Sequence, residues 1–124
     1  MHILMVDDVE ETCQLYAWAL GLEGHTVQMA STGAEAVTLM ETNHYDAIVM
    51  DIMMPEMDGI EALRQIRQLP HGQQIPIVVL TGDRDEDCRV EAMQAGANTV
   101  VYKPILPLVV LKRIEDCRQE SRDQ

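Results

Sequence analysis

Short apolar runs alternate with amphipathic segments along the chain, and this alternation limits the possible folds more than any other feature of the sequence. Each run has the length of one strand, and each intervening segment has the apolar spacing of a helix that packs by one face. A chain that alternates strand and helix is expected to form a parallel sheet with helices on both faces. The runs predict strands at His2–Val6, Thr26–Ala30, Ala47–Asp51, Ile77–Leu80 and Thr99–Lys103.

Four of these runs contain uninterrupted apolar sequence (ILMV, AIVM, IVVL and VVY), which is typical of strands covered on both faces. Between the runs, Thr32 with Glu35 and Asp58 with Glu61 have the spacing of helix capping boxes. Gly96 is expected to end the helix that precedes the fifth strand.

The last helix is expected to have proline in its first turn and one apolar face. These residues are Pro107 for the turn and Val110, Leu111, Ile114 and Cys117 for the face. Nine methionines and no phenylalanine indicate a core of aliphatic and methionine side chains. The methionines expected to fill this core are Met5, Met29, Met50 and Met93.

Length and charge limit the class of protein further. A chain of 124 residues suits one domain, so residues 1–124 are expected to form a single unit. The formal net charge of −12 opposes direct binding to nucleic acid or to an anionic membrane. The first apolar run is too short for a signal peptide or a membrane span, which predicts a cytoplasmic protein. Three widely spaced cysteines fit neither a disulfide framework nor a zinc site and are expected to be reduced.

Reactive side chains stand where the predicted strands end. Asp7 and Asp8 follow the first strand, Asp51 ends the third, Thr81 follows the fourth and Lys103 ends the fifth. Ligands of such sheets bind beyond the carboxyl ends of the strands, so these groups are expected to share one cleft. Gathered carboxylates with no nearby imidazole or thiol favour a hard cation such as Mg²⁺, or Mn²⁺. A metal, a lysine, a hydroxyl and an ionised carboxylate are the components of phosphoryl transfer, with Asp51 as the nucleophile.

These positions resemble the response-regulator receiver domain of bacterial two-component signalling. The resemblance extends over essentially the whole chain and rests on VDD at 6–8, MDIMMPEMDG at 50–59, LTG at 80–82, AGA at 95–97 and YKP at 102–104. It implies a flavodoxin-like fold, with five parallel strands in the order 2-1-3-4-5. It also implies a phospho-accepting switch that catalyses at most its own phosphoryl transfer and slow dephosphorylation.

The resemblance assigns roles to individual residues. Asp51 would accept the phosphoryl group from a phosphohistidine of a sensor kinase or phosphotransfer protein. Asp8 and Asp51 would bind Mg²⁺ directly, Asp7 would act largely through water, and the backbone carbonyl of Met53 would complete the protein ligands. The phosphoryl oxygens would be contacted by Thr81 and Lys103, and the Lys103–Pro104 peptide bond would be cis.

One position departs from the family pattern. Receivers commonly carry an aromatic residue three positions before the lysine, and this chain has Val100 there. Tyr102 projects to the same face of the strand, so it is a candidate substitute. The output surface implied by the family is formed by the fourth helix, the fifth strand and the fifth helix, and would contact an output domain or an effector protein.

Three other functions are less consistent with the sequence. A flavin-binding module needs a phosphate loop after the first strand, where this chain is acidic. A haloacid-dehalogenase-like phosphohydrolase needs a second aspartate two residues after the nucleophile, where Met53 stands. A degenerate receiver would lack part of the site, but all five positions are filled. The histidines lack the sequence spacing of a metal site and are expected at the surface: His2, His25, His44 and His71.

Overall fold

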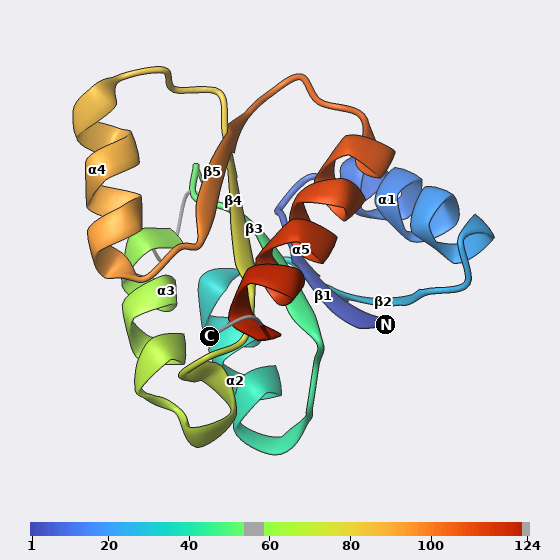
Figure 1. Cartoon of the computed structure of the whole chain (residues 1–124), viewed down its shortest axis with the longest axis horizontal. Coiled ribbons are helices and arrows are strands. Elements are labelled where there is room, and N and C mark those ends of the chain that lie inside the picture. The colour runs from blue at the N-terminus through green and yellow to red at the C-terminus, as the bar shows by residue number, and fades with distance from the viewer. Residues whose placement is uncertain (54–58, 123–124) are drawn as a thin grey trace.

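The computed structural model describes residues 1–53 and 59–122. Five strands and five α-helices alternate along this part of the chain (Figure 1). The strands are β1 (His2–Val6), β2 (Thr26–Ala30), β3 (Ala47–Asp51), β4 (Ile77–Thr81) and β5 (Thr99–Tyr102). The helices are α1 (Glu10–Leu22), α2 (Gly33–Thr42), α3 (Gly59–Gln68), α4 (Glu86–Ala95) and α5 (Pro107–Arg122), with a short 3₁₀ helix, η1 (Pro70–Gly72).

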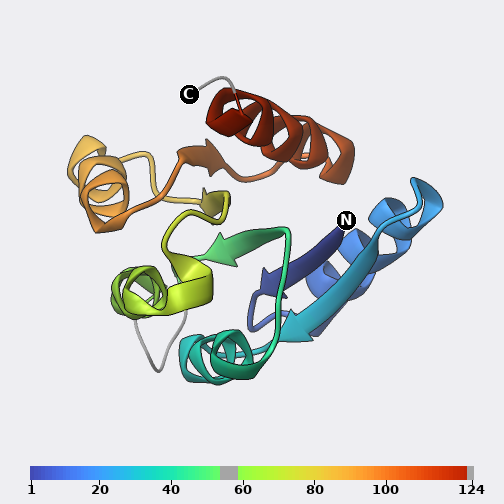
Figure 2. The ribbon, with the colours of Figure 1, turned by 60° about the horizontal axis from the view of Figure 1, so that its bottom comes forward.

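All strand pairs are parallel, and the order across the sheet is β2-β1-β3-β4-β5. This confirms the predicted flavodoxin-like arrangement. Helices α2, α3 and α4 cover one face of the sheet, and α1 and α5 cover the other (Figure 2). The sheet therefore separates two apolar layers, as expected for a parallel sheet.

The uninterrupted apolar sequence of the central strands is explained by the alternation of their side chains between the two faces of the sheet. In β3, Ala47 and Val49 pack with α1 and α5, whereas Ile48 and Met50 pack with α2, α3 and α4. Successive strand residues point to opposite faces, so a strand covered on both sides needs apolar side chains at every position. All five β3 residues are buried, including Asp51.

The edge strand β5 departs from the prediction of full coverage. In β5 only Val101 is buried, while Val100 and Tyr102 are half-buried. At the other edge, Met29 of β2 is 39% exposed, and Met93 on the outer side of α4 is 38% exposed. The expectation that these two methionines fill the core is therefore wrong, whereas Met5 and Met50 are buried.

The helix ends largely follow the predicted signals. The N–H of Glu35 donates to Oγ1 of Thr32 at 3.0 Å, as in a capping box. The Glu35 carboxylate, however, accepts from the N–H of Ser31 at 3.1 Å, one residue before the expected partner. Asp58, the cap predicted for α3, lies outside the described residues. Gly96 follows α4 with φ of +122° and donates to carbonyls of the last turn, as predicted.

Helix α5 begins at Pro107, and its four predicted apolar residues are all buried. All three cysteines are free thiols. Within the described part of the chain, no helix combines the length and the apolar character that crossing a membrane requires.

Arg67, near the end of α3, joins segments that are distant in sequence. Its guanidinium donates to the carbonyls of Gly96, Gly72 and Ile75 and to Oδ1 of Asn98, at 2.7–2.9 Å. Burial lowers the pKa of this guanidinium, and the four acceptors replace the water that it loses. Arg67 therefore ties α3 to the start of β4 and to the turn between α4 and β5.

We expect Arg67→Met to lower the free energy of unfolding by about 2–4 kcal/mol, because buried carbonyls would lose a charged donor. Urea denaturation followed by circular dichroism measures this loss. Arg64→Met is the matched control on the same helix, since Arg64 is half exposed and, among the described residues, its ion pairs are with the surface residues Glu61 and Glu91 at 3.7 and 3.8 Å. It should change stability by less than about 1 kcal/mol. Equal losses in the two variants would contradict the role given to Arg67.

Candidate metal and phosphoryl site

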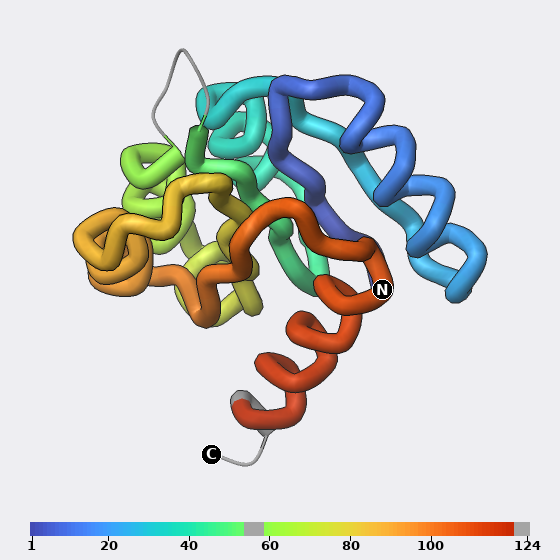
Figure 3. The backbone as a smooth tube through the Cα atoms, turned by 90° about the horizontal axis from the view of Figure 1, so that it is seen from above, coloured from blue at the N-terminus to red at the C-terminus, as the bar shows by residue number. Residues whose placement is uncertain are grey.

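The predicted reactive residues lie along one edge of the sheet, where the strands end. Asp51 and Thr81 are the last residues of β3 and β4, Asp7 directly follows β1, and Lys103 directly follows β5. Asp51 pairs in register with Leu80, and Thr81 with Tyr102, so these strands end at nearly the same level. Figure 3 looks onto this edge from above, with the loops that follow the strands toward the viewer.

Three carboxylates converge at this edge. Asp7, Asp8 and Asp51 each offer an oxygen atom, and these atoms lie within 4.8 Å of one another. The residues Asp7 and Asp51 are 1% and 3% exposed, whereas Asp8 is exposed. Burial of two carboxylates side by side is unfavourable unless cations or donors compensate, because ionised groups lose their hydration.

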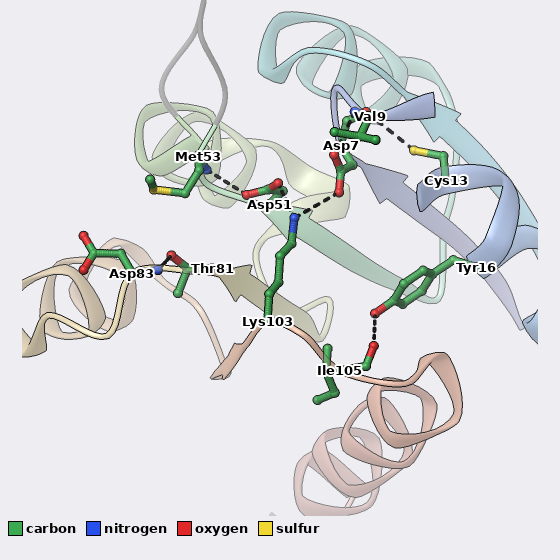
Figure 4. Close-up of polar contacts among 10 residues, drawn as sticks. All are labelled: Asp7, Val9, Cys13, Tyr16, Asp51, Met53, Thr81, Asp83, Lys103 and Ile105. Carbon is green, nitrogen blue, oxygen red and sulfur yellow. Dashed lines mark hydrogen bonds and ion pairs between the residues drawn. The ribbon is translucent and has the colours of Figure 1, made fainter. Parts of the chain in front are cut away.

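Lys103 supplies part of this compensation. Its Nζ lies 2.6 Å from Oδ2 of Asp51 and 3.4 Å from Oδ2 of Asp7, so it bridges the two buried carboxylates (Figure 4). Burial by itself lowers the pKa of Lys103, but the hydrogen bond to Asp51 and the charges of both aspartates outweigh it and raise the pKa. The lysine is therefore held in its charged form.

Backbone donors fix the other oxygen of each buried carboxylate. The N–H of Val9 donates to Oδ1 of Asp7 at 2.9 Å, and the N–H of Met53 donates to Oδ1 of Asp51 at 2.8 Å. Burial nevertheless raises the pKa of Asp7, against the opposing effects of the Val9 N–H and of Lys103. The charge of Asp51 raises this pKa further. The donors and the positive charge around Asp7 therefore do not fully compensate for the burial of its carboxylate.

The donor set fits a small hard cation. Three carboxylates face one lysine, so the ionised cluster has an excess of two negative charges, and its side-chain ligand atoms are oxygens. Oxygen ligands with this charge favour Mg²⁺ or Mn²⁺ over softer metals. The predicted role of the Met53 carbonyl is not tested by these contacts: among the described residues, Met53 contributes its N–H, which donates to Asp51.

Thr81 is buried at the end of β4, but its hydroxyl is engaged locally. Oγ1 accepts from the N–H of Asp83 at 3.0 Å. Among the described residues no hydrogen bond links this hydroxyl to Asp51 or Lys103, although the backbone N–H of Lys103 donates to the Thr81 carbonyl at 2.8 Å. The structure therefore brings Asp7, Asp8, Asp51 and Lys103 into one cluster and places Thr81 beside it, on the strand that follows Asp51 in the sheet.

Two residues of α1 support the site and were not identified from the sequence. The Cys13 thiol donates to the Asp7 carbonyl at 3.5 Å, and the Tyr16 hydroxyl donates to the Ile105 carbonyl at 3.3 Å, next to the cis Lys103–Pro104 bond. Burial and the charge of Asp7 raise the pKa of Tyr16 to about 12 and that of Cys13 to about 11. Both residues are therefore neutral. Only their three-residue spacing on one helix face could have indicated that they lie together.

Tyr102 lies beyond Thr81 at the edge of the sheet. The Arg84 guanidinium lies 4.9 Å from the centre of the Tyr102 ring, in a cation–π contact that joins the β4–α4 loop to β5. Val100 instead packs against the apolar layer under α4, as a partly buried residue. The aromatic side chain near Thr81 is thus already held by the loop that follows Thr81.

Similar proteins include a transcriptional regulator and an uncharacterized protein of about the same length as this chain. The chain is 36% identical over 115 residues to an uncharacterized 14.6 kDa protein of Leptolyngbya boryana, covering 93% of this chain and 88% of that protein. It is 37% identical over 114 residues to the transcriptional regulatory protein SrrA of Staphylococcus aureus, covering 92% of this chain and 46% of SrrA. The chain therefore spans about half the length of SrrA.

Solved structures agree with the fold. A CheY-like receiver domain protein from Methanospirillum hungatei has a TM-score of 0.90 at 27% identity, covering 99% of this chain and 98% of that one. The receiver domain of a sensor histidine kinase from Pseudomonas aeruginosa has a TM-score of 0.85 at 31% identity, covering 93% and 94%. That structure contains a magnesium ion coordinated in the active site cleft. Residues 3–115 match the family described as response regulator receiver domain. The chain belongs to this family of phospho-accepting signalling domains.

Proposed function

We propose that the chain is a Mg²⁺-dependent phosphorylation switch in which Asp51 accepts a phosphoryl group from a phosphohistidine of a partner protein. The observation that carries this proposal is the direct contact of Lys103 with Asp51 inside a cluster of three carboxylates. A structural ion pair needs one carboxylate for one lysine. The two further carboxylates of the cluster are accounted for if a divalent cation binds between them and Asp51.

The metal ligands in this proposal are Asp8 and Asp51 directly, Asp7 largely through water, and the backbone carbonyl of Met53. Bound Mg²⁺, or Mn²⁺, supplies positive charge that offsets the negative charge of the reacting oxygens. The exposure of Asp8 and the burial of Asp7 support the division between them, because a cation can reach Asp8 from solvent.

The reaction requires an oxygen of Asp51 to attack the phosphorus atom of the donor. An O–P bond forms, giving an acyl phosphate, while the P–N bond of the phosphohistidine breaks and its electron pair returns to the imidazole. Lys103 is already charged and lies at Oδ2 of Asp51, from which it can pair with the phosphoryl oxygens. The Thr81 hydroxyl would donate to another of these oxygens.

The proposed partners follow from the family. A sensor histidine kinase or a phosphotransfer protein donates the phosphoryl group, and an output domain or effector reads the surface of α4, β5 and α5. The contact between Arg84 and Tyr102 supports this surface, since it links the loop after Thr81 with β5. The net charge of −12 opposes direct contact with nucleic acid or an anionic membrane.

We expect acetyl phosphate with Mg²⁺ to add one phosphoryl group to the protein, and Asp51→Asn to abolish this addition, because an amide is not a nucleophile here. Intact-mass spectrometry measures the addition, and a sample with EDTA tests its metal dependence. Asp46→Asn is the control, since Asp46 is an exposed aspartate just before β3, at the other end of that strand. Labelling of Asp51→Asn at the wild-type level would disprove the assignment.

We expect Asp8→Ala to weaken Mg²⁺ binding by at least about tenfold and Asp7→Ala to weaken it less, because Asp8 is the proposed direct ligand. Calorimetric titration with Mg²⁺ compares the two variants. Asp8 is exposed, so its replacement should leave the fold intact, which circular dichroism checks. The opposite order of affinities would exchange the two roles.

We expect Tyr102→Ala to reduce the response of the α4, β5 and α5 surface to activation, and Val100→Tyr to increase it. Tyr102 contacts the loop that follows Thr81, whereas Val100 is short and stiff at χ1. Amide chemical shifts with and without beryllofluoride, which stands in for the phosphoryl group, report the response. An unchanged response in Tyr102→Ala would show that the signal leaves the site by another route.

A further inference from the structure

The histidines lie at the edge of the sheet opposite to the carboxylate cluster. Each one precedes or begins a strand: His2 begins β1, His25 precedes β2, His44 precedes β3, and His71 lies in η1 before β4. The starts of parallel strands meet at one edge, just as their ends do. The turns that carry His44 and His71, between α2 and β3 and between α3 and β4, lie beside each other at the bottom of Figure 1.

His44 and His71 are in direct contact. Their ring centres are 3.8 Å apart, with the rings tilted by 52°, and both residues are exposed. In the described part of the chain no hydrogen bond occupies their ring nitrogens. In contrast, Nδ1 of His2 is bonded to Oγ1 of Thr26, and Nδ1 of His25 to the N-terminal amine, both at 2.7 Å. Two imidazole rings from separate turns are thus in contact, and their nitrogens are available to a ligand.

The turn that carries His44 is fixed by hydrogen bonds on both sides. Before it, the backbone N–H and the side-chain amide of Asn43 both donate to the Leu39 carbonyl at 3.0 Å. After it, the N–H of Asp46 donates to the His2 carbonyl at 2.7 Å. The backbone at His44 is therefore held in place.

The turn that carries His71 is fixed as well. The N–H of Gly72 donates to the Leu69 carbonyl at 3.0 Å, and the Gly72 carbonyl accepts from Arg67 at 2.9 Å. The backbone of Gly72 lies so close to Ile66 that no side chain fits there. Both backbones are thus positioned before any ligand binds, which reduces the entropy lost on binding.

We propose that His44 and His71 form a site for a divalent cation of the late first transition series, of which Zn²⁺ and Cu²⁺ are examples. Neutral imidazole is a preferred ligand for these ions, whereas the carboxylates at the opposite edge suit Mg²⁺. A surface cavity of about 410 Å³ has His71 of this pair in its lining, together with Asp46 and Gln73, and leaves room for water ligands on the His71 side. Two protein ligands make this a site of moderate affinity.

The proposed site is independent of phosphorylation. A cation shared by His44 and His71 would connect the α2–β3 turn to the α3–β4 turn, and would stabilise the folded chain because the unfolded chain does not hold these imidazoles together.

Calorimetric titration with Zn²⁺ in saturating Mg²⁺ tests the site, because under the proposed function Mg²⁺ would occupy the carboxylate cluster. We expect one Zn²⁺ per chain, and a loss of at least about tenfold in affinity in both His44→Gln and His71→Gln. The matched controls, His2→Gln and His25→Gln, should bind Zn²⁺ like wild type. Absence of binding to wild type, or wild-type affinity in either the His44 or the His71 variant, would overturn the proposal.

A second measurement does not depend on the folding of variants. NMR of the imidazole resonances of wild-type protein during the Zn²⁺ titration shows which rings bind. We expect the resonances of His44 and His71 to shift or broaden together at one equivalent, and those of His2 and His25 to remain. Perturbation of the latter pair first would place the ion elsewhere and overturn the proposal.

Discussion

Burial of Asp7 and Asp51 beside each other, with Lys103 between them, is the interaction on which the functional edge depends. An ionised carboxylate loses several kcal/mol of hydration when it is buried, and a lysine shared by two carboxylates returns only part of this. The Val9 and Met53 amides supply further donors, yet the pKa of Asp7 remains raised. The edge is therefore built with unbalanced negative charge. That excess of negative charge lowers the stability of the folded chain and favours the binding of a divalent cation. The same residues therefore destabilise the fold and support the proposed chemistry.

Most of the fold could be predicted because apolar sequence reports burial directly. The buried strands β1, β3 and β4 have continuous apolar sequence, and β5 was placed to within one residue. The apolar run of β5 did not indicate its partial coverage, because an edge position is a property of strand order, which came from the family resemblance and not from local sequence. Met29 and Met93 illustrate the same limit, since methionine suits a core and tolerates a surface.

The candidate site was predictable for a different reason. All strands of a parallel sheet end at the same edge, so Asp7, Asp51 and Lys103 could be assigned to one edge before any distance was known. The rule applies equally to strand starts, but the histidines were judged by their spacing along the chain, and the contact of His44 with His71 was missed. For Thr81 the position at the strand end was predicted, but the hydrogen bond that its hydroxyl accepts from the Asp83 amide was not.

The two ends of α4 are held by different contacts, and Arg67 provides those at the C-terminal end. It holds the carbonyl of Gly96 and the side chain of Asn98, immediately beyond the last turn of α4. The first turn of α4 depends instead on Asp85, which accepts from the Asp87 amide, and on the loop that begins at Thr81. The C-terminal end of α4 is thus anchored to α3, while its N-terminal end is connected to the loop at the reactive edge. The C-terminal end of α4 therefore has a polar anchor that does not involve the reactive edge, whereas its N-terminal end shares a loop with Thr81.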